Sequence, residues 1–244
     1  MLSCSLNPYI KDLSEKKIPG FPGICYQCEF YEDGYSDLRV RQLLGENLHE
    51  SLGRAVPKRK SEFVAGRYLA RKALTSLGAN STSVGIGDNR MPLWPDSFVG
   101  SISHCREFAI CAVAKQNNLK GIGIDIENIL NEKSAKDIVN SILLEPEHKL
   151  VESYSTPNPS VLTLIFSAKE SLFKALYPEV GYYFGFDVAQ TTAINFQTGK
   201  FTLKLVQELT PALPVGIRFE GLFELDNNKV FTVVIMPALT DTNI

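Results

Sequence analysis

The chain of 244 residues has little of several features that mark specialised classes of protein. Its five cysteines are an odd and sparse set for a disulfide framework, so we expect free thiols in a reducing compartment. The 25 lysines and arginines nearly balance the 27 aspartates and glutamates, which excludes a global basic field that would draw the protein to nucleic acid or to an anionic membrane. Any anion-binding site must therefore be local.

Long apolar runs are also missing. No stretch approaches the ~20 apolar residues of a transmembrane helix, and the first residues do not join a basic segment to an apolar one as a signal peptide does. We therefore expect a cytoplasmic protein. Its hydrophobic fraction of 44% and charged fraction of 21% are typical of a globular chain with one sizeable core or two smaller ones.

The first 50 residues are rich in turn-forming proline and glycine, with one strand expected near Ile24–Phe30. Cys25 and Cys28 have the spacing of a redox pair or of half a zinc site. No second CxxC or CxxH follows to complete four-coordination. We therefore interpret the two cysteines as buried or incidental thiols.

Hydrophobic residues recur at helical spacing from Pro57 to Gly78. The pattern predicts an amphipathic helix with a proline near its start and a glycine at its C-cap. Its other face carries Lys60, Arg67 and Arg71, which form one basic stripe at 3.6 residues per turn. The stripe is either an anion site or a solvated helix face.

Short strands separated by turns follow this helix, and they are expected at Gly100–His104, Phe108–Ala114 and Gly121–Glu127. The polar residues 115–120 read as a linker between two halves. Helices are expected next, at Ala135–Leu144, Pro146–Val151 and Ser167–Tyr177. Four β-rich segments complete the chain, at Val188–Asn195, Lys200–Gln207, Val215–Leu225 and Val230–Met236. Because the order lacks a regular βαβ rhythm, it predicts an α+β fold with mostly antiparallel sheet.

Two acidic residues share a face of the strand expected at Gly121–Glu127. Gly123, Asp125 and Glu127 occupy one face and three isoleucines the other. Their carboxylates then stand side by side, with Cα atoms about 6.5–7 Å apart, and repel unless solvent or a cation intervenes. A hard cation such as Mg²⁺ neutralises such a pair and often bridges it to a substrate phosphate. The alternative is a strand with a solvated acidic face.

A second group of charged residues lies in the helix expected at Ser167–Tyr177. Ser167 and Glu170 have the spacing of a capping box, and Glu170 forms a favourable i,i+4 pair with Lys174, so a structural role explains both. The apolar side of the helix would leave Lys169, Glu170 and Lys174 on an exposed arc. A carboxylate flanked by two lysines is also what a phosphate-handling site uses.

The remaining candidates carry weaker signals. His104 shares a strand face with Ile102 and follows Ser103, and a lone histidine of this kind is more often a satisfied core or surface group than a ligand. Arg90 lies in a loop rich in turn-forming residues, where it either binds an anion or is solvated.

Read in order, four motifs resemble the Sfp-type 4'-phosphopantetheinyl transferases, most closely the enterobactin-synthetase branch that serves siderophore biosynthesis. They are Lys58-Arg-Lys-Ser-Glu-Phe-Val-Ala-Gly-Arg67, Arg90-Met-Pro-Leu-Trp-Pro95 leading into Gly100-Ser-Ile-Ser-His104, Gly123-Ile-Asp-Ile-Glu127, and Phe166-Ser-Ala-Lys-Glu-Ser171. The resemblance implies a pseudo-dimeric α/β fold, with similar halves at residues 1–116 and 117–244. Each half would pack a small, mostly antiparallel sheet on a long helix, with coenzyme A bound between them.

The resemblance implies an enzyme that transfers 4'-phosphopantetheine from coenzyme A to a serine of an apo carrier domain, releasing adenosine 3',5'-bisphosphate. The partners would be carrier domains of a siderophore-type non-ribosomal peptide synthetase, and the enzyme would be a monomer. Asp125, Glu127 and Glu170 would hold Mg²⁺. Glu170, or a water beside it, would act as the base, and Lys174 would offset charge on the leaving group.

The resemblance also implies how coenzyme A is held. The 3'-phosphate and adenosine end would contact Arg59, Lys60 and Arg67, with Arg90 along the nucleotide. Phosphate oxygens would contact Ser103 and His104, and the remaining contacts would come from Asp125, Lys169 and Lys174. Two departures stand out: Phe166 replaces a tryptophan of many relatives, and Ile126 replaces a third acid of some.

Two other classes stay open. One is a Mg²⁺-dependent phosphatase or nucleotidyl transferase that uses the same three carboxylates, although the chain has neither a P-loop nor an Asp-x-Asp nucleophile motif. The other is a non-catalytic coenzyme-A-binding adaptor, in which Glu170 only caps its helix.

Overall fold

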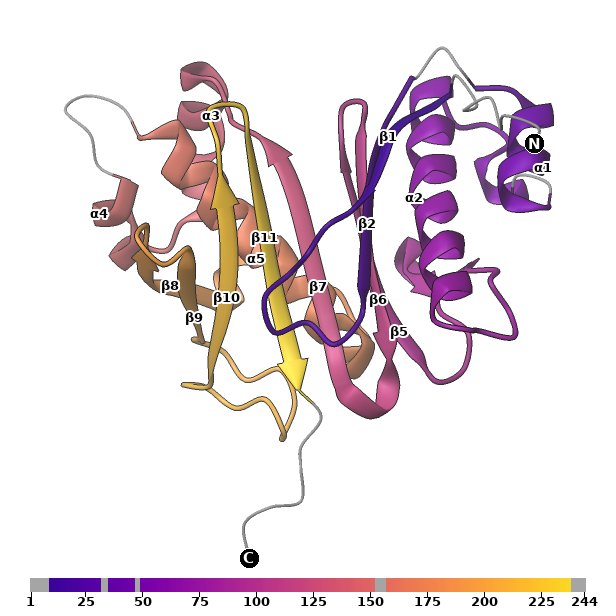
Figure 1. Cartoon of the computed structure of the whole chain (residues 1–244). Coiled ribbons are helices and arrows are strands. Elements are labelled where there is room, and N and C mark those ends of the chain that lie inside the picture. The colour runs from indigo at the N-terminus through magenta and orange to yellow at the C-terminus, as the bar shows by residue number, and fades with distance from the viewer. Residues whose placement is uncertain (1–8, 32–34, 47–48, 152–156, 238–244) are drawn as a thin grey trace, which may run out of the picture. The chain divides into compact units, whose positions relative to one another are not determined.

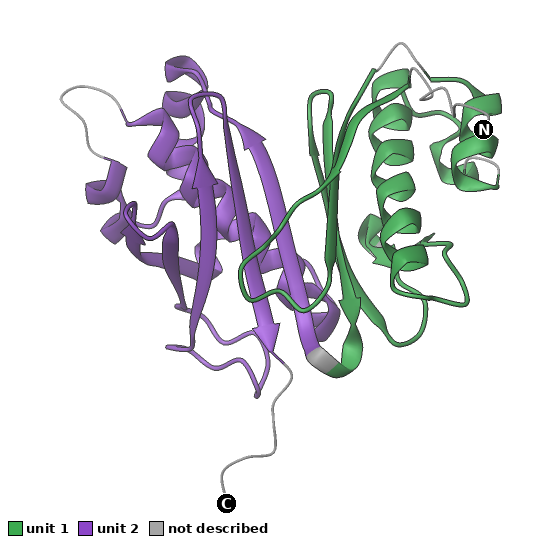
Figure 2. Ribbon diagram, in the orientation of Figure 1, with its two compact units in different colours: residues 1–118 green, residues 119–244 purple. Residues whose placement is uncertain are grey.

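The structure is a computed structural model that describes residues 9–31, 35–46, 49–151 and 157–237. The chain forms two compact units, residues 1–118 and 119–244 (Figure 2), so the division falls between Asn118 and Leu119 where the sequence suggested residues 116 and 117. Each unit packs an antiparallel sheet on one long helix, which confirms the predicted α+β fold with two similar halves (Figure 1).

The first unit is built on a four-stranded sheet in the order β1-β2-β6-β5. These strands are β1 (Ile10–Glu15), β2 (Ile24–Phe30), β5 (Phe98–Cys105) and β6 (Phe108–Lys115). A separate two-stranded ribbon pairs β3 (Gly85–Ile86) with β4 (Pro92–Leu93). The helices are α1 (Asp37–Leu44) and α2 (Pro57–Ser76), with 3-10 turns at Glu50–Leu52, Asp88–Arg90 and Gln116–Asn118.

The long helix α2 covers one face of this sheet. Pro57 occupies its first turn, where no amide hydrogen is needed, and Gly78 follows its end with a φ of 74° that glycine adopts without strain. Leu69 and Leu74 are fully buried against the sheet, in one core with Val113 of β6. The predicted helix is confirmed.

The second unit has a five-stranded sheet in the order β7-β11-β10-β9-β8. These strands are β7 (Leu119–Asn128), β8 (Ala189–Asn195), β9 (Lys200–Leu205), β10 (Arg218–Leu225) and β11 (Lys229–Pro237). The helices are α3 (Glu132–Ile142), α4 (His148–Val151) and α5 (Pro159–Val180), with 3-10 turns at Glu145–Glu147 and Phe186–Val188. The seven strands predicted from Gly100 onward are therefore confirmed, with ends that differ slightly.

Two features differ from the prediction. The helix expected to begin at Ser167 begins at Pro159, because Asn158 caps it by accepting from the amides of Ser160 and Val161. Ser167 therefore lies in the middle of α5, and the predicted capping box with Glu170 is wrong. In addition, β1 and α1 lie in a region for which the sequence predicted only one strand.

The cysteines of the CxxC motif are buried thiols, as we interpreted them. Cys25 and Cys28 lie on β2 and are 1% and 0% exposed. Since side chains alternate along a strand, residues three apart point to opposite faces, and Cys28 alone joins the core beneath α2. Within the described ranges, no helix is both long and apolar enough to cross a membrane.

Two glycines of β7 allow the backbone of α5 to touch this strand. A Cβ atom on Gly123 would lie 1.8 Å from the carbonyl oxygen of Ser171, and one on Gly121 would lie 2.6 Å from that of Ala175. No residue with a side chain fits at either position. Asp125 continues the same face of β7 toward α5, because side chains alternate along a strand.

We predict that Gly123→Ala lowers the free energy of unfolding by at least about 1–3 kcal/mol, since the methyl group must displace α5 from β7. Urea denaturation measures the change. Gly85→Ala is the matched control in a strand, because its nearest neighbour would be the Leu93 Cβ atom at an ordinary 3.5 Å. A Gly123→Ala protein as stable as the wild type would contradict the backbone contact.

Candidate functional site

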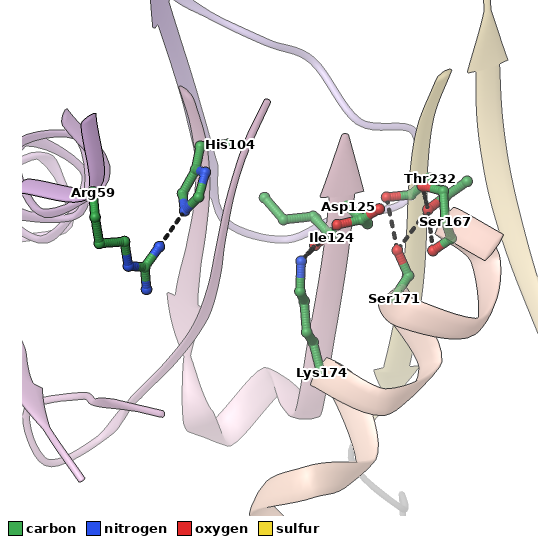
Figure 3. Close-up of polar contacts among 8 residues, drawn as sticks. All are labelled: Arg59, His104, Ile124, Asp125, Ser167, Ser171, Lys174 and Thr232. Atoms are coloured by element: carbon green, nitrogen blue, oxygen red, sulfur yellow. Dashed lines mark hydrogen bonds and ion pairs between the residues drawn. The ribbon is translucent and has the colours of Figure 1, made fainter. Parts of the chain in front are cut away.

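Asp125 is the centre of the polar contacts between β7 and α5. It is 2% exposed, and its Oδ1 accepts a hydrogen bond of 2.7 Å from Lys174 Nζ (Figure 3). The same ammonium donates to the carbonyl oxygen of Ile124 at 3.1 Å. The structure thus joins two motifs that are far apart in the sequence, one on the strand and one on the helix.

Glu127 and Glu170 share this electrostatic environment. The pKa of Glu127 is raised to about 8, chiefly by burial and next by the charge of Asp125, while Lys174 opposes the shift and Glu170 adds to it. Burial also raises the pKa of Glu170, with Lys174 lowering it and Asp125 raising it further. Three carboxyl groups and one ammonium therefore influence one another in a partly buried place.

The chemistry of this donor set fits a hard divalent cation. All three acids offer carboxylate oxygens, the ligands that Mg²⁺ prefers, and a cation would favour the ionised forms that burial and mutual repulsion oppose. Over the residues that the structure describes, however, no three His, Cys, Asp or Glu side chains converge as a ready-made metal centre.

Lys169 is not where the sequence placed it. It is 3% exposed, and its Nζ donates to Glu147 Oε2 at 2.7 Å and to the carbonyl oxygens of Ile142 and Phe186 at 2.8 and 3.1 Å. The expectation that it shares an exposed arc with Glu170 is wrong, because α5 is packed on this side as well. Lys169 stabilises the fold here, and its three donors already have protein acceptors.

The acid that holds Lys169 was missed by sequence reasoning. Glu147 is fully buried, and besides the ammonium it accepts from the amides of Thr191 at 2.6 Å and Leu144 at 2.7 Å. Burial lowers the pKa of Lys169 and the charge of Glu147 raises it. The pair ties α5 to β8 and to the turn before α4.

The first unit contains a pocket of about 750 Å³ between α2, β5 and the β3–β4 loop. This volume is in the usual range for small-molecule sites, roughly 300–1,000 Å³. The charged and titratable side chains in its lining are Arg54, Arg59, Glu62, Arg67, Arg90 and His104. Four arginines and one acid make the pocket strongly cationic. Sequence reasoning named four of these residues and missed Arg54 and Glu62.

Among the residues that the structure describes, Arg67 makes no salt bridge, and other contacts hold it in the pocket. Its Nη2 donates to the carbonyl oxygen of Gly85 at 2.9 Å, and the guanidinium lies 4.8 Å from the centre of the Phe63 ring. Burial lowers its pKa to about 10, so it stays charged at neutral pH. Its Nε is buried and has no hydrogen-bond partner among the described residues. A fixed cation with a remaining donor suits an anionic ligand.

Arg59 and His104 contact each other in the lining of the pocket. Arg59 Nη1 lies 3.0 Å from His104 Nε2 (Figure 3) and 3.4 Å from Glu62 Oε2. The same Glu62 oxygen lies 3.7 Å from His104 Nδ1, so the acid touches both neighbours.

Arg90 is exposed in a loop of the pocket lining. Arg90 and Asn89 have φ values of 66° and 52°, and such left-handed backbone is rare for residues other than glycine.

Other predicted coenzyme A contacts do not line this pocket. The Lys60 ammonium lies 5.8 Å from the centre of the Tyr35 ring, and Ser103 is buried on the face of β5 opposite His104. The residues of the basic stripe predicted on α2 also have different surroundings. Arg67 lines the pocket, whereas Arg71 donates to the carbonyl oxygen of Leu43 at the end of α1.

Two protein-family models match the chain, one within each of its two units. Residues 48–114 match the model of the 4'-phosphopantetheinyl transferase N-terminal domain, and residues 121–220 match that of the 4'-phosphopantetheinyl transferase superfamily. The pocket arginines fall in the first match, and the carboxylates and Lys174 fall in the second.

Individual relatives agree with the family models. The chain is 36% identical over 197 residues to 4'-phosphopantetheinyl transferase Svp of Streptomyces mobaraensis, and the match covers 78% of each chain. It is 42% identical over 160 residues to Enterobactin synthase component D of Salmonella typhi, where the match spans only 66% of each chain. The chain therefore belongs to the 4'-phosphopantetheinyl transferase family, within which it is similar to enterobactin synthase component D.

Proposed function

We propose that this protein transfers 4'-phosphopantetheine from coenzyme A to a serine of an apo carrier domain, with adenosine 3',5'-bisphosphate as the second product. The observation that carries the proposal is the contact of Asp125 with Lys174, which unites the two family motifs in one polar cluster. Transfer of a phosphoryl group needs positioned charge more than covalent help from the protein, and this cluster offers acids and an ammonium together.

We infer that Asp125, Glu127 and Glu170 hold Mg²⁺. When bound, the ion would neutralise charge on the pyrophosphate of coenzyme A. The support for this assignment is the all-oxygen donor set and the raised pKa of each glutamate, which burial chiefly causes and the charge of Asp125 increases.

The protein's own residues have distinct tasks in this proposal. Glu170 accepts the proton of the carrier serine, whose oxygen forms a bond to the β-phosphorus of coenzyme A. The bond from that phosphorus to the oxygen bridging to the α-phosphate breaks, and the leaving group departs with the electron pair. Lys174 offsets the charge that develops on this oxygen.

The cationic pocket of the first unit is proposed to bind the nucleotide end of coenzyme A. Its 3'-phosphate carries two negative charges, which suit the guanidinium groups of Arg59 and Arg67. Arg90 extends the same lining along the nucleotide, and His104 contacts a phosphate oxygen. Lys169 has no part in this proposal, because its donors are used within the fold.

The proposed partners rest on the similarity to enterobactin synthase component D. We propose that carrier domains of a siderophore-type non-ribosomal peptide synthetase are modified, that the enzyme is a monomer, and that it acts in the cytoplasm, where coenzyme A and reduced thiols are found. Competition among apo carriers of several types tests the choice of partner.

Mass spectrometry of an apo carrier incubated with the protein, coenzyme A and Mg²⁺ tests the reaction itself. We predict that the carrier gains the mass of phosphopantetheine, and that a chelator abolishes the gain. Release of free phosphate with no change in the carrier would favour a phosphatase. Tight binding of coenzyme A without any reaction would favour a non-catalytic adaptor.

Glu170→Gln is predicted to lower kcat by about 10²–10⁴, because the amide cannot accept the serine proton and is a poorer cation ligand. The melting temperature should hardly change, since α5 begins well before this residue. Glu208→Gln, at an exposed position, is the control with the same chemical change. Wild-type kcat for Glu170→Gln at saturating Mg²⁺ would remove Glu170 from the mechanism.

Arg67→Ala is predicted to raise KM for coenzyme A by about 10–100-fold, because a hydrogen bond to a charged group usually contributes this much to binding. The increase should be much smaller for 3'-dephospho-coenzyme A, which lacks the proposed partner. Arg71→Ala is the matched control on the same helix, because Arg71 is bonded to Leu43 and does not line the pocket. Equal effects of Arg67→Ala on both substrates would contradict the assignment.

A further inference from the structure

Three buried hydroxyl groups connect α5 to the sheet of the second unit. Thr232 of β11 is fully buried, as are Ser167 and Ser171 of α5 (Figure 3). The Thr232 hydroxyl donates to the carbonyl oxygen of Ser167 at 2.9 Å. Its oxygen lies 2.9 Å from Ser167 Oγ and 2.6 Å from Ser171 Oγ, and in each pair either hydroxyl can be the donor.

Ser171 makes a further contact with the strand. Its hydroxyl lies 3.2 Å from the carbonyl oxygen of Thr232 and can donate to it. The cluster therefore spans one turn of the helix and a single residue of the strand. All these bonds lie in a dry interior, where they are strong and where an unpaired hydroxyl is costly.

Apart from the polar contacts of Lys174 and Lys169, α5 packs on the sheet through apolar side chains, which do not specify position as strictly. Leu164, Ala168, Leu172 and Leu176 pack on the sheet, and hydrophobic burial is non-directional. Hydrogen bonds have narrow ranges of distance and angle, so a helix that slid or rotated on the strand would break them. The hydroxyl cluster thus restricts where α5 lies along β11, the strand that carries Thr232.

The cluster is adjacent to the proposed catalytic groups on both elements. Thr232 is the residue paired with Asp125 across β11 and β7. Ser171 directly follows Glu170 in the chain and lies one helical turn before Lys174. A shift of α5 relative to β11 would therefore move Glu170 and Lys174 relative to Asp125.

We propose that Thr232 is a positioning residue for the transfer reaction, which acts through Ser167 and Ser171 to hold Glu170 and Lys174 of α5 in register with Asp125. Thr232 does not itself contact a substrate in this proposal. The inference rests on the proposed function for its effect on rate, while its effect on the Asp125–Lys174 contact can be measured without substrates.

Thr232→Val keeps the shape of the side chain and removes the hydroxyl. We expect kcat to fall by about 10–100-fold, the size of effect that a small misplacement of catalytic groups produces, while KM for coenzyme A stays near the wild-type value. In the substrate-free protein, Lys174 should react several-fold faster with acetic anhydride, because its contact with Asp125 is loosened. Peptide mass spectrometry follows the modification at Lys174, whose side chain is already 24% exposed.

Two variants separate positioning from a general loss of stability. Thr232→Ser keeps the hydroxyl and should restore both kcat and the slow modification of Lys174. Thr191→Val is the matched control, because Thr191 is a buried threonine of the same sheet whose hydroxyl has no hydrogen-bond partner within the described residues. It should leave both measurements unchanged. If Thr232→Val does not fold, Ser171→Ala tests the same contacts from the helix and should change both measurements in the same direction.

Wild-type modification of Lys174 in a folded Thr232→Val or Ser171→Ala protein would overturn the proposal. The same holds if Thr191→Val accelerates the modification as much as Thr232→Val does. If the wild-type protein shows no transfer at all, the proposed function fails, and the modification rates alone decide whether Thr232 positions α5.

Discussion

The contact between the backbones of α5 and β7 is the constraint on which the carboxylate cluster depends. It exists because Gly121 and Gly123 have no side chains where the helix crosses the strand. The alternation of the strand then directs Asp125 toward the helix, within 2.7 Å of Lys174. A helix held further away by side chains would leave the acid and the ammonium out of contact, and the two motifs would be separate features of the surface.

Apolar burial and polar bonds have different roles on the two sides of α5. Burial of leucine and alanine side chains drives the packing of α5 on the sheet. Because apolar packing tolerates several positions of the helix at similar free energy, the polar contacts select one of them. The hydrogen bonds of Thr232 fix α5 relative to β11, and the buried pair of Lys169 and Glu147 fixes it relative to β8. Glu170, between these two sets of contacts, is held by its neighbours in the chain.

The two units keep charged groups ready for a ligand by different physical means. In the first unit, Arg67 is fixed by a carbonyl oxygen and an aromatic ring, neither of which neutralises its charge. In the second unit, burial and the charge of Asp125 raise the pKa of Glu127 and of Glu170, so part of this unfavourable energy can be released when a cation binds. An anionic substrate bound together with a divalent cation, as in the proposed reaction, matches both arrangements.

Local patterns in the sequence determined most of the secondary structure and the sharing of a strand face by Asp125 and Glu127, because periods of two and 3.6 residues are properties of neighbouring positions. They also carried the family resemblance. The interior position of Lys169 and the partners of Thr232 were decided only by the tertiary structure. The acid that holds Lys169 is 22 residues away, and the serine whose carbonyl Thr232 bonds is 65 residues away. The spacing of residues along the sequence does not indicate such partners, because they meet only when helix and sheet pack together.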